Sequence, residues 1–399
     1  MPAFHRFDPT PCGFPARRVP VLPEMHAHSL TRVANRLQEG ARWYRRGRYA
    51  LAQAYRLAGL ARGTTLLAPA YHCRTMLDPA VGIGADVLLY PVTADLAPDL
   101  AALQVLLARA GAPVKAMLVP HYFGFRQKLD ALISLCDRHD VRLVEDCSHM
   151  LVGACQAGID LPTVGASGHY GVASPYKFFP APDGGLLWSN ASPLPAQRLR
   201  SSSLGEEAKA VAHVFIQGAQ RRQAPDVQQL DAEIELARAS AHAPPRMWIE
   251  EETAPSTLYD RAEEDMRSLA VSRMIVKHTD LRRLATLRRR HYEHWLQATR
   301  DLPGCRPLFS SLPDDCVPYM FPLLIERPQA DFFTLKRLGV PVWRWDETAV
   351  SDCETASSYR LRLLHLPCHQ ELSTDDLLWM TAAVAAVCRQ LPVRSSDVQ

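Results

Sequence analysis

The feature that most constrains the fold is a regular alternation of short apolar segments with segments of helical period between residues 85 and 147. The apolar runs, which are typical of buried strands, lie at 85–92, 114–124 and 141–147. The helix-like segments between them lie at 97–111 and 128–140. Strands that alternate with such helices indicate crossover connections and a mostly parallel sheet covered on both faces. The predicted fold class is therefore α/β, with ligands expected at the carboxyl ends of the strands, near 69–72, 120–122 and 145–146.

The 399-residue chain is long enough to form two domains. We predict an N-terminal arm at 1–30, a large domain at 31–262, a connecting helix at 263–300 and a smaller α+β domain at 301–399. The arm is rich in Pro and Arg, which favours an irregular segment that wraps over the body or over a partner subunit.

The composition argues against several classes of protein. The 45 basic and 42 acidic residues are mixed along the chain, so no strong field favours nucleic acid or an anionic membrane. No segment reaches about 18 consecutive apolar residues, and the N-terminus lacks the apolar run of a secretory signal. Ten cysteines without a C-x-x-C pair argue against a zinc site and favour reduced thiols. We therefore expect a cytoplasmic protein without a metal.

Two further patterns have a structural interpretation that we prefer. The arginine-rich stretch 282–290 has helical period and indicates a solvated helix face, with an anion-binding surface as the alternative. His365 and His369 stand at a spacing that a metal could use, but no third ligand lies nearby in the sequence. We expect these two histidines to be structural or to lie on the surface.

Asp146 and Lys177 are the residues that indicate chemistry. Asp146 ends a buried apolar strand, where a carboxylate is costly unless a cation faces it; the alternatives are a helix cap or an ordinary ion pair. Lys177 stands among Tyr176, Phe178 and Phe179, where burial would lower its pKa toward the neutral amine that condenses with carbonyls. The alternative for Lys177 is a surface lysine whose stem packs on aromatic rings.

Three motifs in this region resemble those of one enzyme family. They are Glu145-Asp146-Cys147-Ser148-His149, then Ser174-Pro175-Tyr176-Lys177, and Asp183-Gly184-Gly185. In this order and spacing the chain resembles the DegT/StrS-type sugar aminotransferases, which are fold-type I enzymes dependent on pyridoxal 5'-phosphate (PLP). The resemblance runs from about residue 40 to 390 and is strongest from 116 to 188. It implies a large domain with a mostly parallel, seven-stranded type of sheet, a small C-terminal α+β domain and a homodimer.

The resemblance also implies roles for individual residues. Lys177 would hold PLP as a Schiff base and carry the proton, and Asp146 would keep the pyridine nitrogen protonated. The other cofactor contacts that it implies are His149 to the phenolic oxygen and Gly47, Arg48 and Ser174 to the phosphate. Cys73 stands where the family has a stacking aromatic residue, and since a thiol cannot stack, Tyr71 or His72 would replace it.

The substrate side of the site is less regular in this chain. His121, Trp343, Arg344 and Trp345 would face the substrate, although buried tryptophans of a small-domain core are an alternative. The family's asparagine from the partner subunit is missing, and Ser272 or Arg273 could replace it or simply lie on a helix surface.

The predicted function is therefore that of a PLP-dependent aminotransferase acting on small molecules. By resemblance, the amino donor would be glutamate and the acceptor a nucleotide-linked keto sugar. One alternative is a PLP-dependent dehydratase or lyase, against which Lys177 argues because dehydratase relatives tend to have histidine there. The other alternative is a non-catalytic descendant that binds PLP or another ligand.

Overall fold

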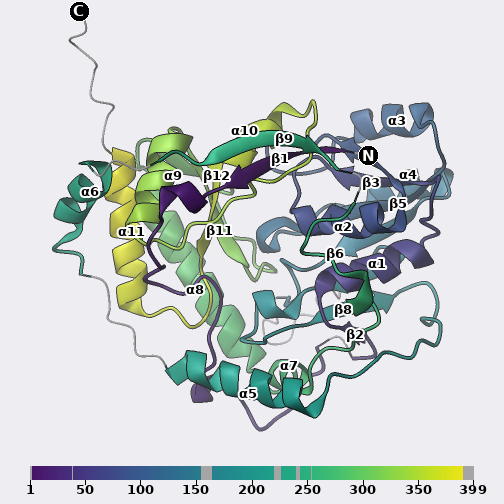
Figure 1. Cartoon of the computed structure of the whole chain (residues 1–399), viewed down its shortest axis with the longest axis horizontal. Coiled ribbons are helices and arrows are strands. Elements are labelled where there is room, and N and C mark those ends of the chain that lie inside the picture. The colour runs from purple at the N-terminus through teal and green to yellow at the C-terminus, as the bar shows by residue number, and fades with distance from the viewer. Residues whose placement is uncertain are drawn as a thin grey trace, which may run out of the picture.

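The computed structural model describes residues 2–37, 39–153, 164–219, 226–239, 243–252 and 254–389. Its centre is a seven-stranded sheet of order β2-β8-β7-β6-β5-β3-β4 (Figure 1). The strands are β2 Arg42–Tyr44, β3 Thr65–Pro69, β4 Asp86–Tyr90, β5 Val114–Pro120, β6 Arg142–Asp146, β7 Tyr170–Ala173 and β8 Gly185–Ser189. Strands β3 to β7 run parallel, and β8 pairs antiparallel with both β7 and β2. The predicted mostly parallel sheet is confirmed.

Helices cover both faces of this sheet, as near-continuous apolar strands require. On one face, Leu66 and Val144 pack in a cluster with the helices α1 Gly47–Leu57 and α2 Arg74–Ile83. On the other face, Leu67 and Leu143 pack in the cluster that contains α3 Leu100–Arg109 and α4 Asp130–Arg138. Because side chains alternate along a strand, consecutive residues of β6 point to opposite faces.

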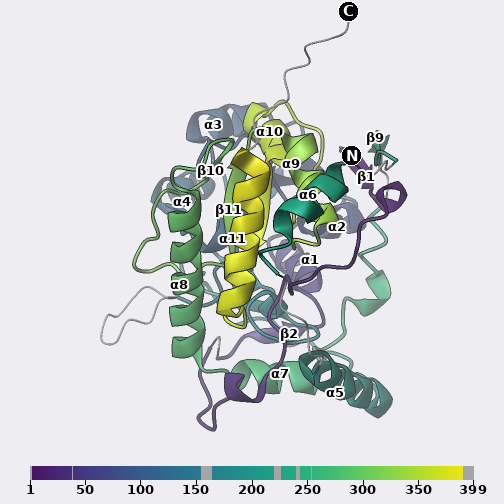
Figure 2. The ribbon, with the colours of Figure 1, turned by 90° about the vertical axis from the view of Figure 1, so that its left-hand side faces the viewer.

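The small domain is an antiparallel sheet of order β10-β11-β12 packed against helices. Its elements are α8 Leu281–Thr299, β10 Cys305–Pro307, β11 Met320–Ile325, α9 Pro328–Arg337, α10 Glu354–Arg362, β12 Leu363–Pro367 and α11 Thr374–Arg389. Figure 2 shows α8 and α11 side by side. Ser373 accepts the backbone N–H of Asp376 at 3.0 Å and so caps the start of α11.

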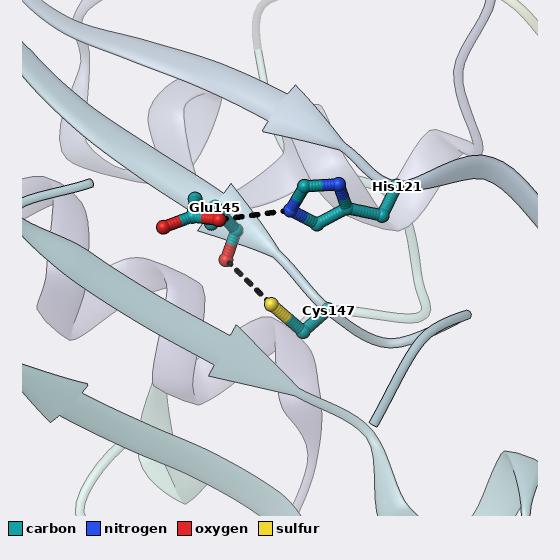
Figure 3. Close-up of side chains that lie close together, drawn as sticks. All are labelled: His121, Glu145 and Cys147. Atoms are coloured by element: carbon teal, nitrogen blue, oxygen red, sulfur yellow. Dashed lines mark hydrogen bonds and ion pairs between the residues drawn. The ribbon is translucent and has the colours of Figure 1, made fainter. Parts of the chain in front are cut away.

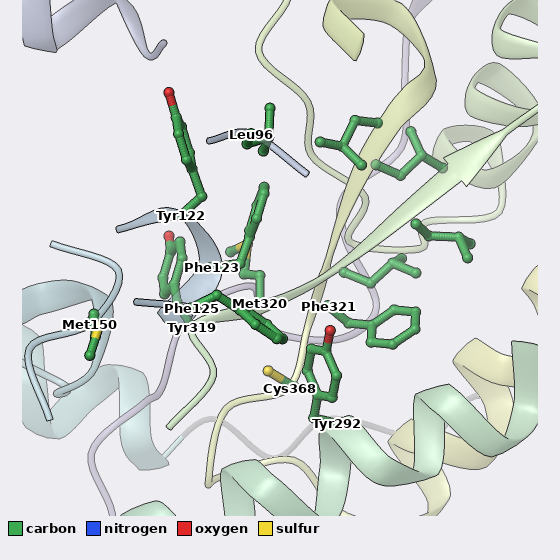
Figure 4. Packing of buried hydrophobic residues seen from close by; sticks show 14 of the residues in the cluster. Leu96, Tyr122, Phe123, Phe125, Met150, Tyr292, Tyr319, Met320, Phe321 and Cys368 are labelled. Atoms are coloured by element: carbon green, nitrogen blue, oxygen red, sulfur yellow. The ribbon is translucent and has the colours of Figure 1, made fainter. Parts of the chain in front are cut away.

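The cores of the two domains are continuous. Figure 4 shows Phe123 and Phe125 of the large domain close to Tyr292 and Phe321 of the small domain. The ring centroids of Phe125 and Tyr292 are 5.9 Å apart, and those of Tyr292 and Phe321 are 4.9 Å apart. A continuous apolar core holds the small domain firmly against the carboxyl edge of the large sheet.

Three features of the domain organisation differ from the prediction. The arm contains a strand, β1 Ala3–Asp8, that pairs antiparallel with β9 Arg246–Glu251. The helix expected over 263–300 is divided into α7 Ala270–Lys277 and α8, because Asp280 accepts the N–H groups of Arg282 and Arg283 and so starts a new helix. α6 Leu230–Ala239, which was predicted in the large domain, packs on α9 and α11 of the small domain. A further helix is α5 Leu204–Ala219.

Within the described part of the chain, no helix combines the length and the apolar character that crossing a membrane requires. Nine of the ten cysteines are described, and all nine are free thiols. The tenth, Cys155, lies outside the described residues.

Candidate active site

A pocket between the two domains gathers side chains from the ends of β6 and β7, from the start of α1 and from the small domain. Its large-domain wall includes Gly47, Arg48, Asp146, Ser148, His149, Ser174 and Lys177. Its small-domain wall includes Tyr319, Met320, Trp343, Trp345 and His365. The structure thus brings Asp146 and Lys177, which are 31 positions apart in the sequence, to one pocket.

Asp146 is the last residue of β6, and its side chain is only 4% exposed. It alternates with Glu145, so its carboxylate projects to the face that carries Val144 and α1. Its Oδ1 accepts the backbone N–H of Ser148 at 2.8 Å, a turn contact of the capping type. No lysine or arginine of the described chain forms an ion pair with this carboxylate, so a cationic ligand group would be the partner that its burial calls for.

Lys177 ends a short 3-10 helix, Pro175–Lys177, that follows β7 directly. Its Nζ lies 5.4 Å from the centroid of the Tyr319 ring. Burial, together with the positive charge of Lys177, lowers the pKa of His365 to about 3 and that of His149 well below its ordinary value. The amine of Lys177 therefore shares the pocket with two imidazoles, those of His149 and His365, and with the Tyr319 ring.

The start of α1 forms the floor of the pocket and is suited to bind an anion. No side chain caps this helix end, and its first turn contains no acidic residue. Ser148 Oγ donates to Ser174 Oγ at 3.1 Å beside it, and a Cβ atom at Gly47 would overlap the Ser174 hydroxyl. Backbone N–H groups and hydroxyls can thus surround a phosphate at the positive end of the helix dipole.

Arg48 lines this pocket, but its guanidinium donates to the backbone carbonyl of Leu258. An arginine that holds a loop in this way has fewer N–H groups left for a ligand. Of the two residues expected to contact a phosphate, Gly47 at the helix end is therefore freer to do so than Arg48.

His149 has a defined tautomer in this site. Its Nδ1 accepts the backbone N–H of Phe123 at 3.2 Å, so in the neutral ring the proton is on Nε2. The imidazole is stacked on Tyr319, with centroids 4.3 Å apart, and it lines the pocket. Its Nε2–H is thus available as a hydrogen-bond donor to a ligand oxygen.

Tyr71 and His72 do not lie in the wall of the pocket, although one of them was expected to stack on the cofactor. The Tyr71 hydroxyl is hydrogen-bonded to His365 Nε2 at 2.9 Å, and the residue is fully buried. His72 Nε2 accepts the N–H of Ala349 at 3.0 Å, and burial lowers its pKa to about 4. The small domain engages both rings, and the residue that reaches the pocket from this loop is Cys73.

His121 is placed behind the pocket, on the opposite face from Asp146, and not toward a substrate. Figure 3 shows His121 directed at Glu145, with Cys147 bonded to the backbone of the same strand. His121 Nδ1 accepts the N–H of Gln127 at 3.0 Å, so its Nε2 carries the proton that it donates to Glu145 at 2.9 Å. Burial opposes ionisation of Glu145, but this bond and those from Ser167 and Gly168 outweigh it and lower its pKa.

Potential ligand atoms of His121, Glu145 and Cys147 lie within 4.8 Å of one another, a spacing that a metal ion could use. A metal bound to Nε2 of His121 would have to displace the proton that this nitrogen donates to Glu145. The hydrogen bonds are sufficient to explain why these groups meet, and their effect is to fix the end of β6 on which Asp146 stands.

The segment 343–345 is extended, and alternation divides its three residues. Trp343 and Trp345 line the pocket, and Trp345 lies 4.8 Å from the Tyr71 ring, centroid to centroid. Arg344 points away: its Nε donates to Asp346 at 2.7 Å, and its guanidinium lies 3.7 Å from the Phe332 ring. A substrate contact of the two tryptophans stays a prediction, whereas Arg344 is a buried residue of the small domain.

Three candidates from the sequence form hydrogen bonds within this chain. Ser272 is buried and donates to Asp183, which also accepts the N–H of Leu269 and so anchors the start of α7. Arg273 donates to the backbone carbonyl of Ser268. His369 is 2% exposed and bonded to the carbonyl of Pro20, so it does not join His365 at a common site.

Arg288 is the residue of this region that the sequence interpretation missed. It is fully buried, and all its N–H groups are engaged with the Gln370 side chain and with four carbonyl oxygens. Those carbonyls belong to Lys177, Phe178, Pro318 and Tyr319. Arg288 thus holds the backbone of Lys177 and that of Tyr319 together across the domain boundary. A helical stripe of Leu284, Arg288 and Tyr292 would have been the signal for its burial.

Comparison with known proteins agrees with this geometry. Residues 45–218 match the profile of the DegT/DnrJ/EryC1/StrS aminotransferase family, which confirms the predicted resemblance. A curated relative, the L-glutamine:2-deoxy-scyllo-inosose aminotransferase of Streptoalloteichus tenebrarius, is 29% identical over 153 residues. That match covers 37% of this chain and 34% of the relative, so it spans about a third of the relative's length.

Solved structures of aminotransferases share the fold over most of the chain. The aminotransferase TlmJ from Streptoalloteichus hindustanus has a TM-score of 0.60 at 21% identity, covering 87% of this chain and 85% of its own. The Helicobacter pylori aminotransferase PseC, involved in pseudoaminic acid biosynthesis, has a TM-score of 0.59 at 14% identity, covering 87% and 86%. The chain therefore has the fold-type I architecture that the sequence predicts.

Proposed function

We propose that this chain is a PLP-dependent aminotransferase that transfers an amino group from an amino acid to a small keto compound. The observation that carries the proposal is that Lys177 and Asp146 line one pocket whose floor is the uncapped start of α1. A primary amine, a buried carboxylate and an anion-binding helix end are the three groups that PLP requires of a protein.

The residues present fit the cofactor at each of these points. Asp146 offers a buried carboxylate without a cationic partner, and a protonated pyridine nitrogen supplies such a cation. Gly47 and Ser174 offer the N–H groups and hydroxyl that a phosphate needs, and His149 offers an Nε2–H to the phenolic oxygen. Bound PLP supplies an electron sink that stabilises negative charge at the substrate's α-carbon.

The side chains of this protein then have separate tasks. Lys177 would hold PLP through its amine and, when that amine is free, would move a proton between substrate atoms. Asp146 keeps the ring nitrogen charged, and Arg288 fixes the backbone from which Lys177 reaches the pocket. Tyr319, Trp343 and Trp345 limit the access of water on the small-domain side.

The proposed acceptor is a keto sugar linked to a nucleotide, and the proposed donor is glutamate. The curated relative's name specifies L-glutamine as donor and a cyclic polyol ketone as acceptor, so both donors and both kinds of ketone belong in the test. Lys177 in the pocket favours amino transfer over dehydration, because a lysine can carry the proton in both half-reactions.

The experiment is a spectrum of the purified protein with PLP, before and after each amino donor. We expect an absorbance band of the covalently bound cofactor that borohydride fixes onto Lys177, as peptide mass spectrometry would show. Glutamate or glutamine should convert the cofactor to its amine form, and a keto sugar should restore the original band. Ammonia or keto acid released without an acceptor would instead indicate a lyase, and no cofactor binding would leave only a non-catalytic ligand-binding protein.

Asp146→Asn should slow the donor half-reaction by about 150-fold to 5,000-fold. The change removes the charge that opposes the ring nitrogen, and losing one partner of a buried pair costs about 3–5 kcal/mol. Single-turnover absorbance with glutamate measures the rate. Asp137→Asn, on the exposed side of α4, is the matched control and should react like the wild type. A rate within about threefold of the wild type would refute the proposed role of Asp146 at the cofactor's ring nitrogen.

Gly47→Ala should weaken PLP binding by about tenfold or more, because the added Cβ overlaps the Ser174 hydroxyl where the phosphate is expected. Fluorescence titration with PLP measures the dissociation constant. Gly205→Ala has open space around the added Cβ and should bind PLP normally. If free phosphate and PLP bind Gly47→Ala as tightly as the wild type, the anion site lies elsewhere.

We further propose that the protein acts as a homodimer in the cytoplasm. Apolar side chains are exposed on α5, where Phe215 is 65% and Ile216 60% exposed, and on β9 at Trp248 and Ile249. Such surfaces favour burial against a second copy. The nine described free thiols suit a reducing compartment. Sedimentation at micromolar concentration would test the dimer.

A further inference from the structure

A second, larger cavity adjoins the pocket of Lys177 and has no role in holding PLP. Its volume is about 840 Å³, within the range of small-molecule sites. Residues 14–17 and 19–25 of the N-terminal arm form one wall. The opposite wall contains residues 179–182, Lys336 near the end of α9, Val340 and Trp343. Leu22, Arg46, Tyr176 and Trp343 line both cavities, so the two are in contact along this edge.

The walls of this arm chamber carry an excess of positive charge. Arg17, Arg46 and Lys336 line it together with His213, against one carboxylate, that of Glu24. Lys336 lies between the rings of Phe14 and Phe332, with its Nζ 5.8 Å from each centroid. The guanidinium of Arg17 lies 5.9 Å from the Trp343 ring. Arg17 and Lys336 contact aromatic rings, and among the described residues neither forms an ion pair.

The ammonium group of Lys336 is in a setting where a nearby anion would stabilise its charge. Burial, followed by the charge of Arg17, lowers its pKa to about 8, and Arg344 acts in the same direction while Asp346 opposes it. A half-buried ammonium at this pKa is charged at neutral pH but poorly compensated. An anionic ligand would supply the missing partner.

The arm that completes the chamber is fixed in place. Arg18 pairs with Glu233 of α6 at 2.8 Å, and its backbone N–H donates to Gly339 at 2.9 Å. Phe14 stacks on Phe333, with centroids 5.9 Å apart. The chamber is therefore preformed, which spares a ligand the cost of ordering the arm.

We propose that the arm chamber binds the phosphate-bearing end of the keto acceptor, with Arg17 and Lys336 as its anion contacts. This inference rests on the proposed function, because the acceptor's carbonyl must reach Lys177 through the edge that the two cavities share. An organic phosphate with an aromatic base would suit both the cations and the rings of Phe14 and Trp343. Arg17 and Lys336 would then select the acceptor and leave the amino donor unaffected.

The test compares the double variant R17M/K336M with R32M/K209M, which removes the same two charges from exposed positions outside the chamber. The probes are uridine diphosphate and inorganic pyrophosphate, titrated by calorimetry into the PLP-loaded proteins. We expect both to bind the wild type and the control, and about tenfold or more weaker binding to R17M/K336M. The rate of the donor half-reaction with glutamate should not change.

Equal affinity of all three proteins for these probes, or no binding to the wild type, would overturn the assignment. The two proposals fail separately. If the wild type shows no reaction of PLP with an amino donor, the proposed aminotransferase function is refuted. If the donor reaction is intact but R17M/K336M binds diphosphate as tightly as the wild type, only the proposed role of the chamber is refuted.

Discussion

Replacement of Lys177 by alanine is expected to reduce turnover by about 10⁴-fold or more while PLP still binds. The amine has two tasks in the proposed reaction, as nucleophile toward the cofactor and as carrier of the proton, and proton transfer alone contributes about 10²-fold to 10⁴-fold. The phosphate contacts at Gly47 and Ser174 and the carboxylate of Asp146 remain in the variant. Affinity for PLP should therefore fall far less than the rate.

Lys177→Arg is the informative companion of this variant. Arginine keeps the positive charge beside Tyr319 but does not lose its proton in proteins and cannot condense with a carbonyl. We expect it to be as inactive as Lys177→Ala, and small amines such as methylamine to restore part of the rate only to the alanine variant. Lys115→Ala, at an exposed ion pair, is the control.

Single-turnover absorbance and borohydride fixation measure both parts of this prediction. More than about 1% of wild-type turnover in Lys177→Ala would mean that another group moves the proton, and His149 and His365 are candidates because both line the same pocket. A borohydride adduct on a different lysine would refute the assignment of Lys177 altogether.

The sequence was sufficient for the large sheet because its signals are local. Each strand core is a short apolar run and each crossover helix has its own period, so the existence and the parallel direction of β3 to β6 follow from local segments. Asp146 and Lys177 could be predicted for the same reason, since Asp146 ends β6, Lys177 follows the end of β7, and the ends of parallel strands meet at one edge.

Contacts between distant segments could not be predicted in this way. β1 acquires its strand conformation from β9, about 240 positions later, and nothing near β1 in the sequence specifies that partner. Tyr71 and His72 are drawn from the pocket by His365 and Ala349, which lie 294 and 277 positions away. The interpretation of residues 71–73 depended on a simple alignment, whereas the small domain decides which of them faces the ligand.

The interpretation of the arginine-rich stretch as a solvated face was wrong at Arg288, for a different reason. Its charges suggested a solvated face, and that holds for Arg282 and Arg290, which are exposed. Arg288 shares its side of α8 with Leu284 and Tyr292, which are both buried. The i, i+4 spacing of these three residues predicts that Arg288 is buried, which the number of arginines in the stretch does not.

Arg288→Met should lower the apparent free energy of unfolding by about 3–5 kcal/mol, the usual cost of breaking a buried charged network. Methionine fills much of the volume but leaves the carbonyls of Lys177, Pro318 and Tyr319 without their donor. Burial lowers the pKa of Arg288 to about 10, so the group is charged at neutral pH and its hydrogen bonds are charge-assisted. Urea unfolding of the PLP-loaded protein measures the loss.

Arg290→Met on the exposed side of the same helix controls for helix propensity and net charge, and should change stability by less than about 0.5 kcal/mol. Arg288→Lys keeps the charge but not the five-donor geometry, so we expect an intermediate loss. If Arg288 only stabilises the fold, the folded Arg288→Lys protein should capture PLP at the wild-type rate. Our interpretation instead requires slower borohydride-sensitive capture of PLP, because the backbone of Lys177 is no longer held against that of Tyr319. If Arg288→Lys captures PLP at the wild-type rate, Arg288 stabilises the domain boundary without positioning the amine.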